Sequence, residues 1–354
     1  MKWPTYTKSC RNDIDSVLKA SAVSAYRSNR QWGVGPKAGS NVYQFERELE
    51  KAWSVKHCVA MNSGTVALTA AIKALELPPG SEILTTPFSF SATPASIVLA
   101  GHTPRFADVS PDHFCLDPES VKKSITRKTK AILNVDLFGY LPDYTKLKEF
   151  GLPIIQDNCQ AAGAVRDGKH LHGDIAIGSG NGQKNLPVIE GGWAYTNDGK
   201  YADRMRHYIS HGENFDKLEV GVNGRMHELC AILARHGLKD LDERNKRRRE
   251  LAGIILGSSE QSHSYYCLPF LVKHKREQFA AACKARGLEI GCGYINPSLE
   301  KYAAFRRFIK HKLPVVTELS ERTLCLIYNA TPDKSLSWGR SIKRLLEEVT
   351  DEVL

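Results

Sequence analysis

Short apolar segments alternate with helical segments from residue 58 to residue 157, and this alternation constrains the fold more than any other feature. Strand–helix alternation builds a largely parallel sheet with helices on both faces. In such α/β folds, ligands bind beyond the carboxyl ends of the strands. The predicted strands are Cys58–Met61, Ser81–Thr86, Pro104–Val109, Lys130–Leu137 and Leu152–Gln156.

A glycine-rich segment with a single lysine follows the short apolar run Ile175–Ile177. It extends from Gly178 to Gly192 and places Lys184 among five glycines. Glycine permits close approach of the backbone to a bound group, and a lysine amine can attack carbonyl groups when its surroundings activate it. Lys184 is therefore a candidate for a Schiff base. The alternative is a solvated lysine in a flexible loop.

A second candidate site begins where the predicted strand Cys58–Met61 ends. Ser63 is a good capping residue, and the alanine-rich stretch after Gly64 and Thr65 predicts a helix. Free N–H groups at a helix start bind phosphate. The segment fits both a plain capped helix and an anion site. Thr65, Phe90, Asp157 and Lys184 all fall just after predicted strands, so we expect them to line one crevice.

The length of 354 residues allows one large domain and a smaller one. A long helix is predicted near Arg225–Asn245, and the composition changes after it. We therefore expect a large domain at residues 1–245, whose N-terminal segment can pack on the small domain. The rest, residues 246–354, is expected to form a smaller α+β domain.

Composition argues against several classes of partner. No apolar run is long enough to cross a bilayer, so no membrane partner is expected. The nine cysteines are dispersed without metal-site spacing, which indicates a reducing cytoplasm and no bound metal. The net charge of +10 favours anionic partners. The basic run Lys246–Arg249 lies among acidic residues without interleaved aromatics, so nucleic acid is not the expected partner.

Short motifs occur in a fixed order along most of the chain. They are Gly39 with Phe45–Glu46, Asn62–Leu68, Ser89–Thr93, Arg127–Gly139, Gln156–Ala161, Gly173–Asp174, Ser179 with Lys184–Asn185, Glu190–Gly192, His211–Gly212, Asn223–Met226, and Leu313–Pro314 with Glu318. Together these motifs resemble the sugar aminotransferases of the DegT/DnrJ/StrS type. The resemblance implies their aspartate-aminotransferase fold (fold type I) and their cofactor, pyridoxal 5'-phosphate (PLP).

The resemblance also implies a role for each matching residue. Lys184 would hold PLP and later move a proton between substrate and cofactor. Asp157 would keep the pyridine nitrogen protonated; without the resemblance it would be a strand-end turn residue. The other implied cofactor contacts are Gln160 to the phenolic oxygen, Phe90 stacked on the ring, and Gly64, Thr65 and Ser179 on the phosphate.

Three further residues are implied at the edge of the site. Asn223 would reach the phosphate in the neighbouring subunit of a homodimer with shared active sites. Arg225 and His211 would contact the substrate, although Arg225 is equally well explained by a structural ion pair. For Phe90, the alternative is a core aromatic.

The chain departs from the family pattern beside the lysine. The family has Phe-Ser-Phe where this chain has Gly178, Ser179 and Gly180, so we expect extra space beside the cofactor. The alternative is that both glycines only pack closely under the sheet. Cys159 replaces the usual alanine, which is a further change near the cofactor.

Three functions remain open. The resemblance favours amino transfer from glutamate or glutamine to a nucleotide-linked keto sugar, in amino-sugar biosynthesis. The same cofactor could instead serve a non-nucleotide ketone such as a cyclitol, or a sugar dehydration, although dehydrating relatives carry histidine in place of the lysine. The third possibility is that the chain is a non-catalytic relative. The retention of Lys184 and Asp157 argues against it, because the fold requires neither residue.

Overall fold

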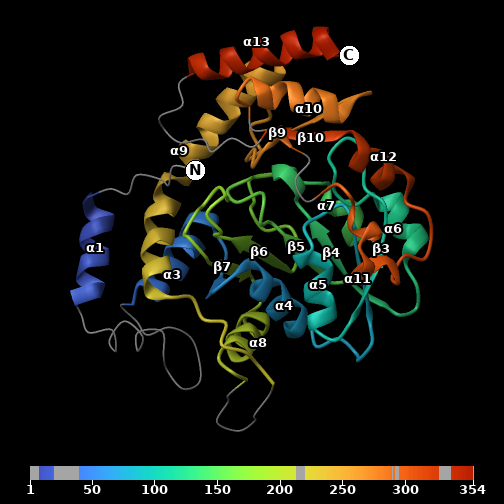
Figure 1. Cartoon of the computed structure of the whole chain (residues 1–354). Helices are drawn as coiled ribbons and strands as arrows, with labels where there is room; N and C mark the ends of the chain where they lie inside the picture. The colour runs from blue at the N-terminus through green and yellow to red at the C-terminus, as the bar shows by residue number, and fades with distance from the viewer. Residues whose placement is uncertain are drawn as a thin grey trace.

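The computed structural model describes residues 8–19, 40–212, 220–288, 290–291, 295–326 and 336–353. Gly39 of the first motif lies outside them. The described strands form a seven-stranded sheet, in the order β1-β7-β6-β5-β4-β2-β3, and a three-stranded sheet, in the order β8-β10-β9 (Figure 1). The strands are β1 (His57–Met61), β2 (Glu82–Thr85), β3 (Thr103–Phe106), β4 (Thr129–Val135), β5 (Ile154–Asp157), β6 (Ile175–Ser179), β7 (Gly192–Thr196), β8 (Leu268–Leu271), β9 (Ile290–Gly291) and β10 (Thr323–Leu326).

The large sheet is mostly parallel, as predicted. β3, β2, β4, β5 and β6 run parallel to one another, whereas β7 pairs antiparallel with both β6 and β1. The sequence analysis did not predict β7, because Gly191 precedes it directly, Gly192 begins it, and glycine weakens a strand signal. The antiparallel β6–β7 pair makes residues 180–191 a connection at one end of the sheet.

Helices cover both faces of the large sheet (Figure 1). Ile175 and Ile177 of β6 pack on the side of α4, α5 and α8, whereas Ala176 between them packs on the side of α3 and α9, as strand alternation requires. The helices are α1 (Lys8–Lys19), α3 (Asn41–Trp53), α4 (Gly64–Ala74), α5 (Ala92–Leu99), α6 (Pro118–Ser124), α7 (Tyr144–Lys148), α8 (Gly199–Ile209), α9 (Glu228–Leu256), α10 (Arg276–Ala285), α11 (Ala303–Arg306), α12 (Pro314–Arg322) and α13 (Leu336–Val353), with 3-10 turns η1 (Leu137–Gly139) and η3 (Leu299–Lys301).

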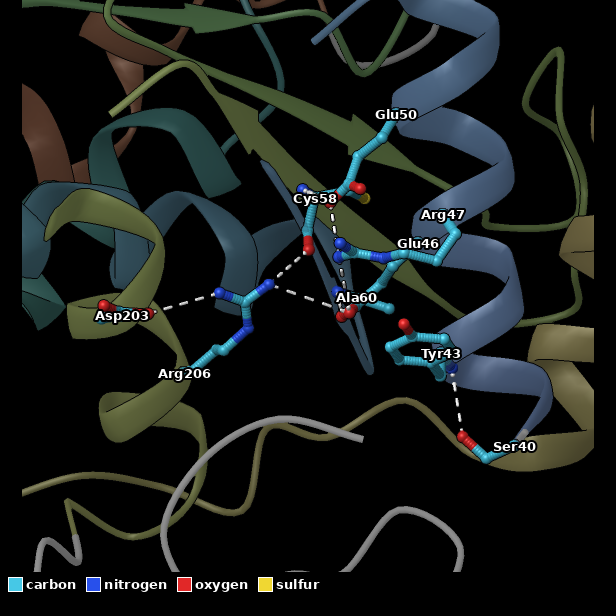
Figure 2. A network of polar contacts seen from close by, with 9 residues as sticks. All are labelled: Ser40, Tyr43, Glu46, Arg47, Glu50, Cys58, Ala60, Asp203 and Arg206. Atoms are coloured by element: carbon cyan, nitrogen blue, oxygen red, sulfur yellow. Dashed lines mark hydrogen bonds and ion pairs between the residues drawn. The ribbon is translucent and has the colours of Figure 1, made fainter. Parts of the chain in front are cut away.

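Side chains bond most of the outer edge of β1 (Figure 2), and its last residue, Met61, forms an isolated antiparallel bridge with Arg225. Glu50 Oε1 accepts a hydrogen bond from the Cys58 N–H at 2.7 Å, and Glu46 Oε1 accepts one from the Ala60 N–H at 2.8 Å. Arg206 of α8 donates to the Cys58 carbonyl at 3.0 Å and lies 3.9 Å from Glu46 Oε2. These bonds use the backbone groups that an exposed edge would offer to another chain, and they give Glu46 of the first motif a structural role.

Long-range contacts hold the start of helix α3. Glu228, at the start of α9, accepts hydrogen bonds from the Asn41 N–H at 2.9 Å and from the Val42 N–H at 3.3 Å. Its carboxylate thereby binds the N-terminus of α3, where the helix dipole favours negative charge.

The smaller sheet packs under α10 and α13, which lie side by side at the top of the view (Figure 1). Asp108, after β3, joins the two parts: its carboxylate accepts from the N–H groups of Val315 and Val316, at 3.0 Å and 2.7 Å, at the start of α12. The predicted boundary between residues 245 and 246 would fall inside α9 and stays a prediction. The helix expected to end at Asn245 continues to Leu256, where Gly257 terminates it in the left-handed conformation.

Candidate active site

The connection between β1 and α4 forms a candidate anion site. Ser63 caps α4, and its Oγ accepts a hydrogen bond from the Val66 N–H at 3.2 Å. Gly64 and Thr65 stand in the first turn, where a helix offers no internal acceptor for N–H groups. A Cβ at position 64 would lie only 3.0 Å from the Ser179 Cβ. Glycine therefore brings the helix start against Ser179, and the N–H groups and hydroxyls together suit a phosphate.

Asp157, the last residue of β5, presents a buried carboxyl group to the same pocket. Thr93 donates its hydroxyl to Asp157 Oδ2 at 3.2 Å, and the Cys159 N–H donates to Oδ1 at 3.2 Å. Burial raises the pKa of Asp157, while the hydrogen bonds from Cys159, the charge of Lys184 and the Thr93 hydroxyl oppose that rise. A buried carboxyl of this kind gains most from a cationic partner inside the pocket.

Lys184 lies in the connection between β6 and β7. Its Nζ is 4.6 Å from the centroid of the Tyr266 ring, which is a cation–π geometry. The next residue, Asn185, is buried and donates through Nδ2 to Asn245 Oδ1 at 3.0 Å and to the Ser264 carbonyl at 2.9 Å. The lysine is therefore carried by a connection that α9 anchors, and its amine lies against an aromatic face.

The glycines that flank Ser179 do not open space beside the pocket, so that expectation is wrong. A Cβ at Gly178 would overlap the indole of Trp193, its cross-strand partner, and one at Gly180 would overlap the Val188 side chain. Both neighbours belong to the core cluster on the α3 face of the sheet. The alternative of close packing under the sheet therefore holds.

One pocket of about 280 Å³ collects most of the predicted site residues. Phe90 lies at this pocket and is 51% exposed, so it is not a core aromatic. The Gln160 amide is oriented by the Phe138 N–H, which donates to its Oε1 at 3.0 Å. The predicted residues in the lining are Gly64, Thr65, Phe90, Asp157, Gln160, Ser179 and Lys184.

Three predicted residues lie outside the lining of this pocket: His211, Asn223 and Arg225. They belong to a segment that runs beside the start of α4. The Asn62 N–H donates to the Gly224 carbonyl at 2.8 Å, and Asn62 Nδ2 donates to the Asn223 carbonyl at 3.1 Å. The Asn223 side chain is exposed. The roles of all three residues stay predictions.

The pocket also contains residues to which the sequence analysis gave no role. Thr93 had a signal, because it ends a quoted motif and stands one helical turn after Ser89. Tyr266 had none, since it lies far along the chain from the other residues of the pocket, in the part predicted to form the small domain. The additional lining residues are Ser63, Leu68, Ser89, Ala92, Thr93, Val135, Cys159, Asn181, Gln183, Glu190 and Tyr266.

The residues present fit the groups of PLP. The helix start at Gly64 and the Ser179 hydroxyl suit its phosphate, and the buried Asp157 suits its pyridine nitrogen. Lys184 supplies an amine for its aldehyde. The Cβ-free cradle at Gly64 provides the close backbone approach that a phosphate needs. The volume is near the lower end of the range for small-molecule sites, roughly 300–1,000 Å³.

Known proteins are similar to this chain in sequence and in fold. A family model of the DegT/DnrJ/EryC1/StrS aminotransferase family matches residues 18–334. The spore coat polysaccharide biosynthesis protein SpsC of Bacillus subtilis is 34% identical, over 61% of this chain and 60% of its own length. The UDP-2-acetamido-2-deoxy-3-oxo-D-glucuronate aminotransferase of Pseudomonas aeruginosa is 29% identical, over 81% of this chain and 85% of its own length.

A solved structure extends the likeness to the whole described fold. The aminotransferase from Psychrobacter cryohalolentis superposes with a TM-score of 0.87 at 26% identity, covering 100% of this chain and 99% of that one. The predicted aspartate-aminotransferase-like fold is thus confirmed. The family match covers nearly the whole chain and includes both Asp157 and Lys184. The chain therefore belongs to the DegT/DnrJ/EryC1/StrS family of PLP-dependent aminotransferases.

Proposed function

We propose that this chain transfers an amino group from L-glutamate or L-glutamine to the keto group of a nucleotide-linked sugar. The observation that carries the proposal is the meeting of Lys184, Asp157 and the helix start at Gly64 in one pocket. An amine, a buried carboxyl group and an anion site are the three groups that a PLP aminotransferase requires.

The proposal assigns roles to the polar and aromatic residues at the centre of the pocket. When bound, PLP supplies an aldehyde that links to amines and a ring that withdraws electrons. Lys184 would hold the cofactor through Nζ, and its freed amine would be the group that moves a proton from the substrate carbon. The Asp157 carboxylate keeps a proton on the pyridine nitrogen. Tyr266 holds the Lys184 ammonium against its ring face.

The remaining contacts place the cofactor. The N–H groups of Gly64 and Thr65 and the Ser179 hydroxyl bind the phosphate. Phe90 covers one face of the ring, and Gln160 binds the phenolic oxygen. Asn181 Nδ2 donates to Glu190 Oε1 at 2.8 Å, and both residues line the pocket, so this pair is our candidate for contacts to sugar hydroxyls.

The proposed substrate class rests on the substrate for which one relative is named and on the net charge of this chain. The Pseudomonas aeruginosa relative is named for a UDP-linked keto sugar. The net charge of +10 attracts a diphosphate-bridged substrate. A non-nucleotide ketone such as a cyclitol remains the competing substrate.

We further propose a homodimer with shared active sites, in which Asn223 reaches the neighbouring pocket. Phe90, Leu99 and Ile189 are between 50% and 66% exposed, on the segment before and within α5 and on the lysine connection. Exposed apolar side chains beside a pocket are the kind that a second subunit covers.

A cytoplasmic location belongs to the same proposal. Cys10, Cys58, Cys115, Cys159, Cys230, Cys267, Cys283 and Cys325 are all free thiols in the described ranges. Free thiols persist in a reducing compartment. Among the described helices, none combines the length and apolarity needed to span a bilayer. Fractionation of the native cells tests the proposal.

A single-turnover assay tests the substrate. The protein is first converted to its aminated form with glutamate, and the return of the PLP absorbance is then followed with each acceptor. A UDP-linked keto sugar should restore the absorbance at least tenfold faster than free keto acids or a cyclitol ketone do. Equal rates for all acceptors would contradict the nucleotide-sugar proposal.

A further inference from the structure

A buried carboxyl group that the proposed mechanism does not use lies next to Asp157. Asp136 follows the neighbouring strand β4, and its side chain is fully buried. Its backbone N–H donates to the Asp157 carbonyl at 3.0 Å. The two acidic residues therefore stand side by side at the carboxyl end of the sheet, where the pocket forms.

Four side-chain donors bind the Asp136 carboxyl group. On Oδ1, the Tyr144 hydroxyl donates at 2.6 Å and Asn134 Nδ2 donates at 3.1 Å. On Oδ2, Gln156 Nε2 donates at 2.8 Å and Asn158 Nδ2 donates at 3.0 Å. Oδ2 thus binds both residues that flank Asp157 in the sequence.

This arrangement fixes the backbone around Asp157. The amide of Gln156 is held at its other end as well, because Gln156 Oε1 accepts from the His172 N–H at 2.8 Å. The Asn158 N–H donates to the Ile177 carbonyl of β6 at 2.9 Å. With residues 156 and 158 held on one side of β5, the side chain of Asp157 is directed to the other side by strand alternation.

The network also sets the charge of Asp136. Burial raises the pKa of Asp136 from 3.8 to about 7 even though the hydrogen bonds from Asn158, Tyr144 and Gln156 hold it down. Donors directed at both oxygens suit an anion, because a carboxylate only accepts hydrogen bonds. An anion beside Asp157 favours positive charge in the pocket that Asp157 faces.

We propose that Asp136 is a positioning residue for the cofactor: it holds both neighbours of Asp157, directs the Asp157 carboxylate at the pyridine nitrogen of PLP, and favours the proton on that nitrogen. The inference rests on the proposed role of Asp157. Asp136 itself and the four side chains that donate to it are proposed to contact neither substrate nor cofactor.

The test compares two ligands that differ in one atom. Affinities of the full-length apoprotein are measured for PLP and for its deaza analogue, in which carbon replaces the pyridine nitrogen. Asp136→Asn should lower the preference for PLP over the analogue by about tenfold, the equivalent of one pKa unit. A merely structural role would weaken both ligands alike and leave this preference unchanged.

A second pair of variants keeps the test valid if Asp136→Asn fails to fold. Asn158→Ala removes one donor on the Asp157 side of the network, so the preference for PLP should fall about threefold. Tyr144→Phe is the comparison: it removes one donor from the opposite oxygen but leaves both bonds to the neighbours of Asp157 in place, so the preference should fall less than in Asn158→Ala. It should lower the melting temperature but keep the preference within twofold of the native value.

The outcomes separate this inference from the proposed function. Asp157→Asn is measured in parallel and should lose most of the preference for PLP. If it does so while Asp136→Asn and Asn158→Ala retain the native preference, the role of Asp136 is refuted and that of Asp157 stands. If Asp157→Asn also retains the preference, the proposed role of Asp157 fails, and the inference fails with it.

Discussion

Asp157 and Lys184 approach the pocket from two different connections, and each is oriented by neighbours of its own. Thr93 and Cys159 donate to the Asp157 carboxylate, while the Tyr266 ring lies beside the Lys184 amine. Held in this way, both groups lose little additional side-chain entropy when a ligand binds.

Replacing Lys184 with alanine should reduce turnover by about 10³-fold or more, since it removes both the covalent anchor and the proton carrier. The phosphate contacts should still retain PLP without a covalent bond. Borohydride reduction and peptide mapping of the native protein should place the cofactor on Lys184. Lys200→Ala, at an exposed lysine of α8, is the control, and label on any other lysine would refute the assignment.

Replacing Asp157 with asparagine should slow the reaction by at least about 10²-fold, because a neutral amide does not stabilise a proton on the pyridine nitrogen. The rate of the half-reaction with glutamate measures this effect directly. A Thr93→Val variant, which removes one donor but keeps the charge, should retain most of the rate. A native rate in Asp157→Asn would exclude the electron-sink role.

Sequence reasoning found residues whose signal is local. Asp157 and Lys184 each follow a strand, and Gly64 begins a helix, so the α/β pattern alone brought them to one edge. Tyr266 reaches the pocket only because the chain returns from the smaller sheet, and no local pattern encodes that return. The Asp136 network depends on the register of β4 against β5, which the strand prediction left undefined.

At the scale of elements, the pairing of β6 with β7 explains the glycines beside the lysine. The indole of Trp193 on β7 lies across Gly178 on β6, so its large side chain fills the space where Gly178 has none. The prediction of extra space failed because β7 itself was not predicted. Without that strand, nothing in the sequence indicated which side chain would fill the gap.

Gly178→Phe should destabilise the fold by about 1–3 kcal/mol, the usual cost of overpacking a core. Trp193 would have to leave its place, and the core cluster on the α3 face would repack. Chemical denaturation measures the loss, and adding Trp193→Ala to Gly178→Phe should recover part of it. An unchanged melting temperature in the single variant would show that the glycine is not needed for packing.

The buried carboxyl group of Glu46 should make the stability of the β1 edge depend on pH. Burial raises its pKa from 4.5 to about 7, against the opposing charge of Arg206. The folded state thus binds this proton more tightly than the unfolded state does. Its contribution to stability is full below pH 4.5 and is lost as the pH rises towards 7.

Glu46→Gln should therefore flatten the decline in unfolding free energy between pH 5 and pH 8. The amide oxygen can still accept from the Ala60 N–H, so the fold should persist. Urea denaturation at both pH values gives the difference, and Glu119→Gln on the surface is the matched control. An equally steep decline in Glu46→Gln would rule out this titration.

At the scale of the whole molecule, the proposed dimer makes a prediction about complementation. Dimers of Lys184→Ala subunits and dimers of Asn223→Ala subunits should each be impaired. A mixed dimer of the two should regain one intact site, because both substitutions then fall in one of its two pockets and leave the other unchanged. Activity of purified mixed dimers measures the recovery. A protein that sediments as a monomer at full activity would contradict shared sites.

The bonding of α3 and β1 has a consequence for synthesis on the ribosome. β1 pairs with β7, and Asn41 binds Glu228, which lies 187 residues further along the chain. At about 5–20 residues per second, this partner emerges roughly 10–40 s after Asn41. The parallel strands β2 to β6 are complete before then. Helix α3 and strand β1 are thus made before β2 to β6 but are secured only after them.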